Sequence, residues 1–405
     1  MIKIKSKQDY KRLRRLALSA QGLLQTKPFG RGIAGAKKAI SHIGYVQLDT
    51  ISVVERAHHH VFYSRVPNFK PDMANKLLNK REIFEYWSHA AAFLPMEDFR
   101  FSLLYKQAIK SGQTHWYKNP DKKLMADILA RIQSEGPLKS RDLEANPNKR
   151  AGWWDWKPAK KAVEQLYMQG DLMVSDREGF QKTYDLTERV LPDNVNTQMP
   201  STKEFANHLI DQQLRCHGLV TLKGITYLRR NSELRKAVKT SIEQRLSDNE
   251  LELVKLDSGE QFYVQAGGLD ARMLSVKERM LILSPFDNSV IQRERLKSLF
   301  GYDYQIECYV PEPKRQFGYF CLPLLFRDEF IGRMDCKAHR KNKHLEIKSL
   351  HFEKHDFDNE QVIAAFKEAV CEFCRFQNCD TVSLVSVNSK ALTEQLQAEL
   401  NDIAL

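Results

Sequence analysis

A glutamine and an aspartate stand two residues apart in the segment YVQLDT, as Gln47 and Asp49. Alternate side chains of an extended backbone share a face, so these two would project the same way, roughly 6.6 Å apart along the chain. A carboxylate can stabilise developing positive charge or activate water, and an amide can donate and accept hydrogen bonds. The plainer alternative is a half-buried edge strand with a polar outer face.

The charge balance favours a polyanionic partner. Of 405 residues, 63 are Lys or Arg and 51 are Asp or Glu, so the net charge is +12. This surplus points to nucleic acid first and to an acidic membrane second. The sequence has no run of about 18 apolar residues, which argues against a membrane span. The basic N-terminus indicates an amphipathic helix rather than a signal peptide. Seven widely spaced cysteines suit a reducing cytoplasm better than a disulfide framework.

Three consecutive histidines, His58 to His60, invite a metal interpretation. Neighbouring side chains diverge in a strand or a helix, and no nearby cysteine or HExxH motif completes a site. We expect one ring to pack inside the protein and the others to contact phosphate or substrate. The CxxC at Cys371 and Cys374 lacks a second pair, and its place on a helix with an apolar face predicts buried or semi-buried neighbours rather than zinc ligands.

Tryptophans and basic residues concentrate in residues 148–157. Indoles can stack on bases or wedge a duplex, and cations neutralise phosphates, although one or two tryptophans could instead anchor a core. Another basic segment, residues 313–317, lies at a predicted strand end, where a solvated loop is the alternative. The candidate DNA contacts are His58, His59, Arg65, Trp153, Trp154, Lys157, Lys160, Lys161, Lys314 and Arg315.

Three stretches share an order of helices followed by a two-stranded hairpin, which is the order of a winged helix. In the middle stretch a helix over 121–135 precedes a basic helix that ends at Gly170, and a hairpin turns at residues 177–179. After about residue 275 strand-like segments predict a curved sheet or small barrel with flanking helices. The predicted class is α+β, with winged helices over 1–117, 118–199 and 200–275 and a β-barrel-like domain over 276–405.

Several motifs resemble those of the YcaQ/AlkZ family of bacterial winged-helix DNA glycosylases, and the YcaQ (AlkX) branch most of all. The first is the long segment that begins GYVQLDT. The others, in the same order along the chain, are EYWSHAAAFLP, GWWDWKPAKKAVEQL, YDLTERVLP, LSPFDN and GYDYQIECYVPEPKRQFGYF. The similarity runs along essentially the whole chain.

The resemblance implies three tandem winged helices and a β-barrel around DNA. It implies hydrolysis of the N-glycosidic bond of N7-alkylated purines and unhooking of interstrand crosslinks. The candidate motif itself offers a carboxylate and an amide but no amine, so we expect no strand cleavage. The catalytic motif of the YcaQ branch, Gln-hydrophobic-Asp, stands here as Gln47-Leu48-Asp49. This chemistry requires no metal or organic cofactor. The expected partner is lesion-bearing duplex DNA, bound by a monomer in the bacterial cytoplasm at the nucleoid; the competing function is a non-enzymatic DNA-binding regulator.

Overall fold

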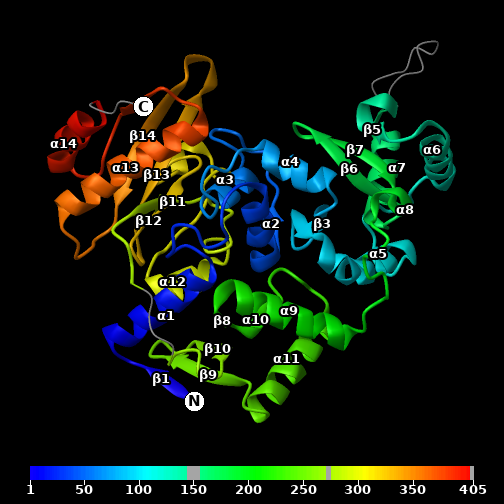
Figure 1. The fold of residues 1–405 in the computed structure, drawn as a ribbon, viewed down its shortest axis with the longest axis horizontal. Coiled ribbons are helices and arrows are strands. Elements are labelled where there is room, and N and C mark those ends of the chain that lie inside the picture. The colour runs from blue at the N-terminus through cyan, green and yellow to red at the C-terminus, as the bar shows by residue number, and fades with distance from the viewer. Residues whose placement is uncertain (144–155, 271–274, 402–405) are drawn as a thin grey trace. The chain divides into compact units, whose positions relative to one another are not determined.

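The computed structural model describes residues 1–143, 156–270 and 275–401 (Figure 1). The chain divides into two compact units. Unit 1 comprises Met1–Lys70 and Ala206–Leu405, and unit 2 comprises Pro71–Phe205. Both combine helices with sheets, which confirms the predicted α+β class. None of the helices in the described ranges is long and apolar enough to cross a membrane.

Unit 1 holds the N-terminal helices and the C-terminal half of the chain. Its elements are β1 (Ile2–Ile4), α1 (Lys7–Ala20), α2 (Gly32–Ile43), β2 (Val46–Gln47), α3 (Ala57–Tyr63), most of α9 (Thr202–His217), β8 (Leu219–Val220), α10 (Leu222–Ile225), α11 (Ser232–Ser247), β9 (Leu251–Leu256), β10 (Gln261–Gln265), β11 (Met280–Ile282), α12 (Arg293–Phe300), η3 (Glu312–Lys314), β12 (Leu322–Phe326), β13 (Glu329–His339), η4 (Arg340–Asn342), β14 (His344–Phe352), α13 (Asn359–Gln377), β15 (Thr381–Leu384) and α14 (Lys390–Asn401).

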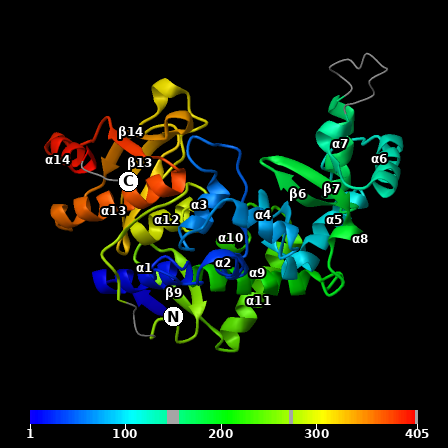
Figure 2. The ribbon, with the colours of Figure 1, turned by 45° about the horizontal axis from the view of Figure 1, so that its top comes forward.

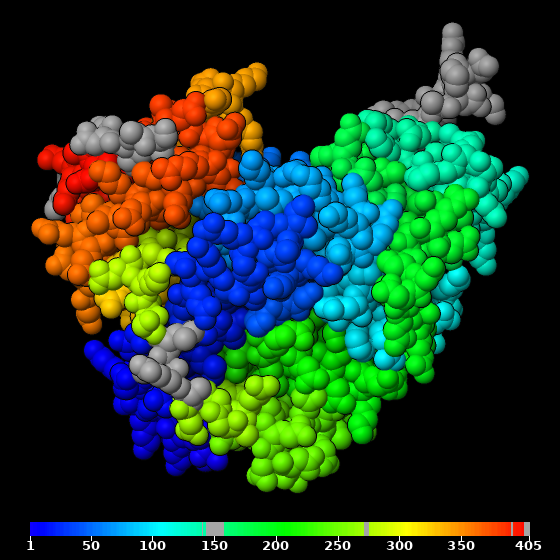
Figure 3. Space-filling view, viewed as in Figure 1, coloured from blue at the N-terminus to red at the C-terminus, as the bar shows by residue number. Residues whose placement is uncertain are grey.

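The chain begins with a strand, although the sequence predicts an amphipathic helix there. Residues 2–4 form β1, which pairs in parallel with β9 in a sheet of order β1-β9-β10-β8. Helix α1 starts only after Ser6, because Ser6 and Asp9 form a reciprocal capping box with two hydrogen bonds of 3.1 Å. In the space-filling view the dark blue N-terminal residues lie against the yellow-green residues of this sheet (Figure 3).

The predicted helix and hairpin of the third stretch are confirmed. Helix α11 is capped by Asn231, whose side chain accepts a hydrogen bond of 2.9 Å from Leu234 N–H. Strands β9 and β10 then pair antiparallel through a turn at Gly259, which has φ 97°. A positive φ of this size favours glycine, so local turn chemistry fixes the hairpin.

The predicted C-terminal sheet has five strands in the order β11-β12-β13-β14-β15. Its tight turn falls at Arg327-Asp328, because Phe326 pairs with Glu329. Register shifts at Leu324/Leu325 and at Asp335/Cys336 mark bulges, which bend strands. Helix α13 packs on this sheet in one apolar cluster, and its buried Cys374 belongs to that cluster, as the interpretation of the CxxC as buried neighbours predicts (Figures 1 and 2).

Unit 2 contains the predicted middle hairpin. Strands β6 and β7 pair antiparallel, with Glu178 opposite Gln181 and Gly179 in the turn at φ 61°. Its elements are α4 (Asp72–Asn79), β3 (Ile83–Trp87), β4 (Ala91–Pro95), η1 (Met96–Ser102), α5 (Leu103–Lys110), α6 (Lys122–Glu135), β5 (Leu138–Lys139), η2 (Ser140–Leu143), α7 (Trp156–Met168), β6 (Leu172–Glu178), β7 (Gln181–Leu186) and α8 (Thr187–Val190).

Candidate active site

The YVQLDT segment starts where α2 ends. Gly44 closes this helix in the left-handed conformation, with φ 81°, and its N–H donates to Ile40 O over 2.8 Å. A Cβ atom at residue 44 would clash with the side chain of Gln212. Backbone conformation and space therefore both favour glycine at the point where the chain turns into the segment.

Burial along the segment ends at Asp49. Val46 is fully buried and Gln47 is 9% exposed, whereas Asp49 is half-buried and Thr50 is exposed. The edge-strand alternative predicts a polar outer face that includes Gln47, whereas the Gln47 side chain is buried. Strand β2 spans only Val46–Gln47, and the Asp49 carboxylate lies where the segment reaches the surface.

The Asp49 carboxylate folds back on its own backbone. Its Oδ1 accepts a hydrogen bond of 2.7 Å from Ile51 N–H, the pattern of an Asx turn. Partial burial raises the pKa of Asp49, and the hydrogen bond from Ile51 only partly opposes this rise. Such a carboxylate is a better proton acceptor than an ordinary aspartate, and once ionised it is a negative charge in a partly dry site.

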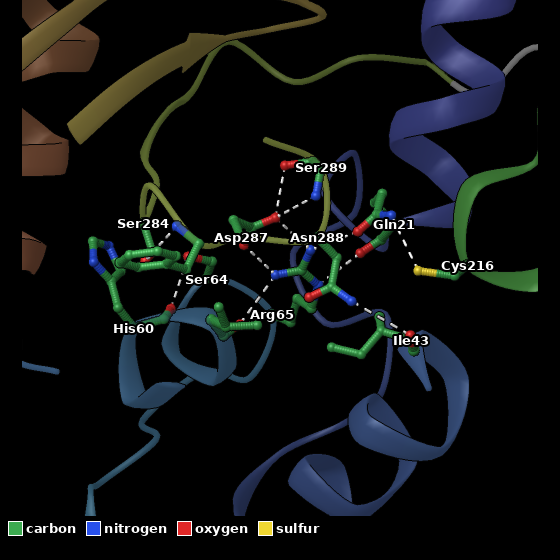
Figure 4. Close-up of polar contacts among 12 residues, drawn as sticks. Gln21, Ile43, His60, Ser64, Arg65, Cys216, Ser284, Asp287, Asn288 and Ser289 are labelled. Atoms are coloured by element: carbon green, nitrogen blue, oxygen red, sulfur yellow. Dashed lines mark hydrogen bonds and ion pairs between the residues drawn. The ribbon is translucent and has the colours of Figure 1, made fainter. Parts of the chain in front are cut away.

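Asn288 holds the backbone in front of Gln47. Its buried Nδ2 donates to Tyr45 O over 3.1 Å and to Ile43 O over 3.4 Å (Figure 4). The LSPFDN segment thus reaches the chain at the end of α2 and the start of the candidate motif. These hydrogen bonds position the backbone that leads into Gln47 and Asp49.

The neighbouring Asp287 forms a buried, two-pronged ion pair with Arg65. The two guanidinium nitrogens lie 2.6 and 2.9 Å from the Asp287 oxygens, and both side chains are fully buried. Arg65 also donates to Gln21 O over 2.9 Å and to Val61 O over 3.1 Å. Ser289 donates to Asp287 through its N–H and its hydroxyl (Figure 4). The ion pair therefore ties the residues directly after α3 to the LSPFDN segment.

The residues after Asp49 lie along β13. Ala338 N–H donates to Val53 O over 2.8 Å, and Arg340 donates to Ser52 O and Val54 O over 2.9 Å each. The candidate motif is therefore held on both sides, by Asn288 before it and by the C-terminal sheet after it. Rigid support of this kind is what a catalytic carboxylate requires.

The three histidines have three different environments. His60 is fully buried and its Nε2 lies 2.8 Å from Ile282 O, and burial lowers its pKa to about 4. The sequence predicts one buried ring, and the structure has two, because His58 is buried as well as His60. His59 is half-buried with Nδ1 2.8 Å from Glu55 Oε1, and His58 is only 3% exposed. Within the described residues, no group of three or more His, Cys, Asp or Glu side chains is arranged to hold a metal ion.

Burial corrects two of the predicted DNA contacts. Arg65 is 1% exposed and its guanidinium is paired inside the protein, so it cannot meet a phosphate in this conformation. His58 is also buried, with its ring 4.2 Å from that of His59. A charged or polar residue type in a basic chain was the signal for both predictions, and that signal carries no information on burial.

The candidates around α7 lie in unit 2. Trp153 and Trp154 fall outside the described residues, as does the side chain of Lys157. Lys160 and Lys161 are exposed on α7, as a contact with phosphate requires. Their role in DNA binding stays a prediction.

The candidates Lys314 and Arg315 belong to a loop of unit 1. Lys314 is exposed in η3, and the guanidinium carbon of Arg315 lies 4.9 Å from the ring centre of Tyr319. Arg315 Nε also donates to Val310 O over 2.9 Å. Reasoning from residue type missed three residues. Asp287 and Asn288 belong to the LSPFDN motif, and the exposed Tyr309 belongs to the ECYVPEPKRQ motif of this loop.

A comparison with protein families decides the class of protein. The family model described as DNA glycosylase AlkZ-like matches residues 40–376, which include Gln47, Asp49, Asp287 and Asn288. The chain belongs to the AlkZ-like DNA glycosylase family. It is therefore a DNA N-glycosylase and not a regulator without enzymatic activity.

A solved structure shows the same fold as this AlkZ-like chain. The DNA glycosylase AlkZ of Streptomyces sahachiroi matches with a TM-score of 0.60 at 14% sequence identity, over 95% of this chain and 100% of that one. The likeness covers nearly every element described above, so the fold extends beyond the residues that the family model matches.

Proposed function

We propose that this AlkZ-like protein is a monofunctional glycosylase that hydrolyses the N-glycosidic bond of N7-alkylguanine and unhooks interstrand crosslinks formed through such bases. The observation that carries the proposal is the half-buried Asp49 carboxylate, two residues after Gln47, in a segment that is held on both sides and reaches the surface at Asp49. Since these residues all come from one chain, we propose that the protein acts as a monomer.

Asp49 and Gln47 fit the chemistry of this lesion. Alkylation at N7 makes guanine cationic and a good leaving group, so the base needs little help from a general acid. Positive charge then develops on the sugar as the bond breaks. An ionised Asp49 would stabilise this charge and orient or deprotonate the attacking water, and Gln47 would position the same water through its amide.

We propose three winged helices, over residues 1–117, 118–199 and 200–275, and a barrel-like domain over 276–405. The order of elements supports this: α6, α7 and the β6–β7 hairpin follow one another in the middle stretch, and α9, α10, α11 and the β9–β10 hairpin in the third. In the first stretch helices α2 to α4 precede the β3–β4 hairpin. In a winged helix the last helix before the hairpin can enter a groove of DNA.

The product is expected to be an intact strand that carries an abasic site. Bifunctional glycosylases cut the strand through an amine that forms a Schiff base, and the chain has no lysine between Lys38 and Lys70. A duplex with one N7-methylguanine, incubated with the protein, should break only after heat or alkali, and a crosslinked duplex should separate into single strands.

Borohydride provides the opposing result, because it traps a Schiff base as a covalent protein–DNA adduct. A trapped adduct would overturn the monofunctional assignment. The first lysine to replace would then be Lys106 in unit 2, since burial lowers its pKa to about 7 and so leaves its amine partly neutral near neutral pH. Lys106 is only 4% exposed, with Nζ 3.9 Å from the ring centre of Phe99, so no adduct is expected.

DNA affinity is expected to fall steeply with salt and to depend little on sequence. The net charge of +12 is spread over several segments, so contacts with phosphate should dominate. If six or more phosphates are neutralised, affinity should fall by about 10³-fold or more between 50 and 200 mM salt. Fluorescence anisotropy with two duplexes of unrelated sequence measures how the affinity for each depends on salt concentration. An affinity that does not change with salt, or a tight preference for one duplex, would contradict the prediction.

A further inference from the structure

The loop between Glu307 and Gly318 is fixed at its base by one carboxylate. Glu307 accepts hydrogen bonds from the backbone N–H groups of Gln316, Phe317 and Gly318, at 2.9, 2.8 and 3.1 Å. The pKa of Glu307 is lowered, because these hydrogen bonds outweigh the effect of its burial. The two ends of the loop are therefore joined, and the residues between them are presented on a closed support.

Tyr309 lies at the tip of the first turn of this loop. Val310 N–H donates to Glu307 O over 2.9 Å, and this turn leaves Tyr309 81% exposed. Single exposed apolar residues are common on proteins, so exposure alone assigns no role. What distinguishes Tyr309 is that its loop and the candidate motif are both hydrogen-bonded to strand β13.

The loop and the candidate motif are attached to the same strand. Asp335 of β13 accepts hydrogen bonds from Tyr319 N–H and Phe320 N–H at 3.0 and 3.2 Å, which places the end of the loop. Three residues further along β13, Ala338 N–H donates to Val53 O, which places the residues after Asp49. Ile51 and Ile306, which flank these two segments, pack against the same apolar cluster.

The charge of Asp49 reaches this loop. The pKa of Tyr309 is raised by partial desolvation first, and then by the Cys308 thiol and the Asp49 carboxylate. The pKa of Cys308 is raised by burial first and then by Asp49. The loop also carries the exposed Lys314 and the guanidinium of Arg315, so an exposed aromatic ring and two cations belong to one short loop of unit 1.

We propose that Tyr309 stacks on a DNA base next to the lesion, while Lys314 of the same loop contacts a backbone phosphate. This inference rests on the proposed function, in which Asp49 acts on the damaged nucleotide and Tyr309 contacts the base next to it. Aromatic rings stack on any base, so Tyr309 would hold the opened duplex without selecting a sequence.

Binding to a duplex with a tetrahydrofuran abasic analogue, and with 2-aminopurine as the base next to it, tests this role without any excision. Tyr309→Ala is expected to weaken binding about tenfold and to abolish the change in 2-aminopurine emission, while leaving the salt slope unchanged. Tyr309→Phe keeps the ring and should bind within about twofold of the wild type. The matched control, Lys314→Ala, should keep the emission change and lower the salt slope by about 1.

The inference is overturned if Tyr309→Ala binds and changes 2-aminopurine emission as the wild type does. It is also overturned if Tyr309→Ala lowers the salt slope, since the residue would then act through phosphate. A wild-type protein that fails to release N7-methylguanine would refute the proposed function, and the binding measurements would still decide the role of Tyr309.

Discussion

Replacing Asp49 by asparagine is expected to slow single-turnover release of N7-methylguanine by about 10²–10³-fold, or roughly 2.7–4 kcal/mol of transition-state stabilisation. Asparagine keeps the shape of the side chain and can still accept the hydrogen bond from Ile51 N–H. It removes the negative charge that would face the developing sugar cation. The measurement is the rate of base release at saturating enzyme, so that a change in affinity does not enter the result.

The fold and the affinity for DNA should survive this change. A thermal melt should show no loss of stability, because Asp49 is half-buried with a raised pKa and its ionised form is not stabilised by folding. The exposed neighbour offers a matched control: Thr50→Val should release the base at the wild-type rate. If Asp49→Asn folds normally and releases the base at the wild-type rate, the catalytic role of Asp49 is wrong.

The pH dependence gives an independent test of the same carboxylate. The raised pKa of Asp49 means that its ionised, active form is lost at a higher pH than for an ordinary aspartate, near 3.9. After subtraction of uncatalysed release, the rate should therefore fall as pH decreases through the pKa of Asp49 in the folded protein. Asp49→Asn should lose this acidic limb, whereas a limb that persists in the variant would belong to another group.

Local sequence signals predicted much of the fold. The hairpin β6–β7 lies where the sequence places it, because alternation and turn chemistry act over a few residues. Strand β1 could not be predicted in this way. Its three residues pair with β9, which lies about 250 positions further along the chain, and only the tertiary fold brings the two together.

The candidate site shows the same division. The spacing of Gln47 and Asp49 is visible in the sequence, and so is their shared chemistry. The burial of Gln47 is not visible in the sequence. The hydrogen bond from Asn288 to Tyr45 O is not visible either, because the two residues lie 243 positions apart. The prediction that Arg65 contacts DNA is wrong for the same reason. Its partner Asp287 lies 222 residues further along the chain, and the sequence alone does not distinguish a buried arginine from an exposed one.

The ion pair of Arg65 with Asp287 is expected to be the largest single electrostatic contribution to stability near the site. Asp287→Ala should lower the free energy of unfolding by about 3–5 kcal/mol, because it leaves the guanidinium buried without a counter-charge. The matched control is Glu294→Ala, which breaks the exposed pair with Lys223 and should change stability little. Chemical denaturation of both variants beside the wild type measures the difference.

Acid should remove the difference between Asp287→Ala and the wild type. Burial alone would raise the pKa of Asp287, but Arg65 and the hydrogen bonds from Ser289 leave it lowered. A carboxyl group whose pKa is lower in the folded state stabilises the protein above its unfolded pKa, and this contribution is lost as pH falls through the folded pKa. Equal stability of wild type and variant at neutral pH would show that the pair does not support the fold.

Arg65→Met combined with Asp287→Leu separates the charge from the packing. Removing both charges leaves no buried ion unpaired, so the double variant should recover much of the stability lost in Asp287→Ala. Its base release should stay slow, because the substitutions disturb the turn in which Asn288 holds the backbone before Gln47. If Arg65→Ala instead weakened DNA binding at unchanged stability, Arg65 would be a phosphate contact and not the anchor of α3 to the LSPFDN segment.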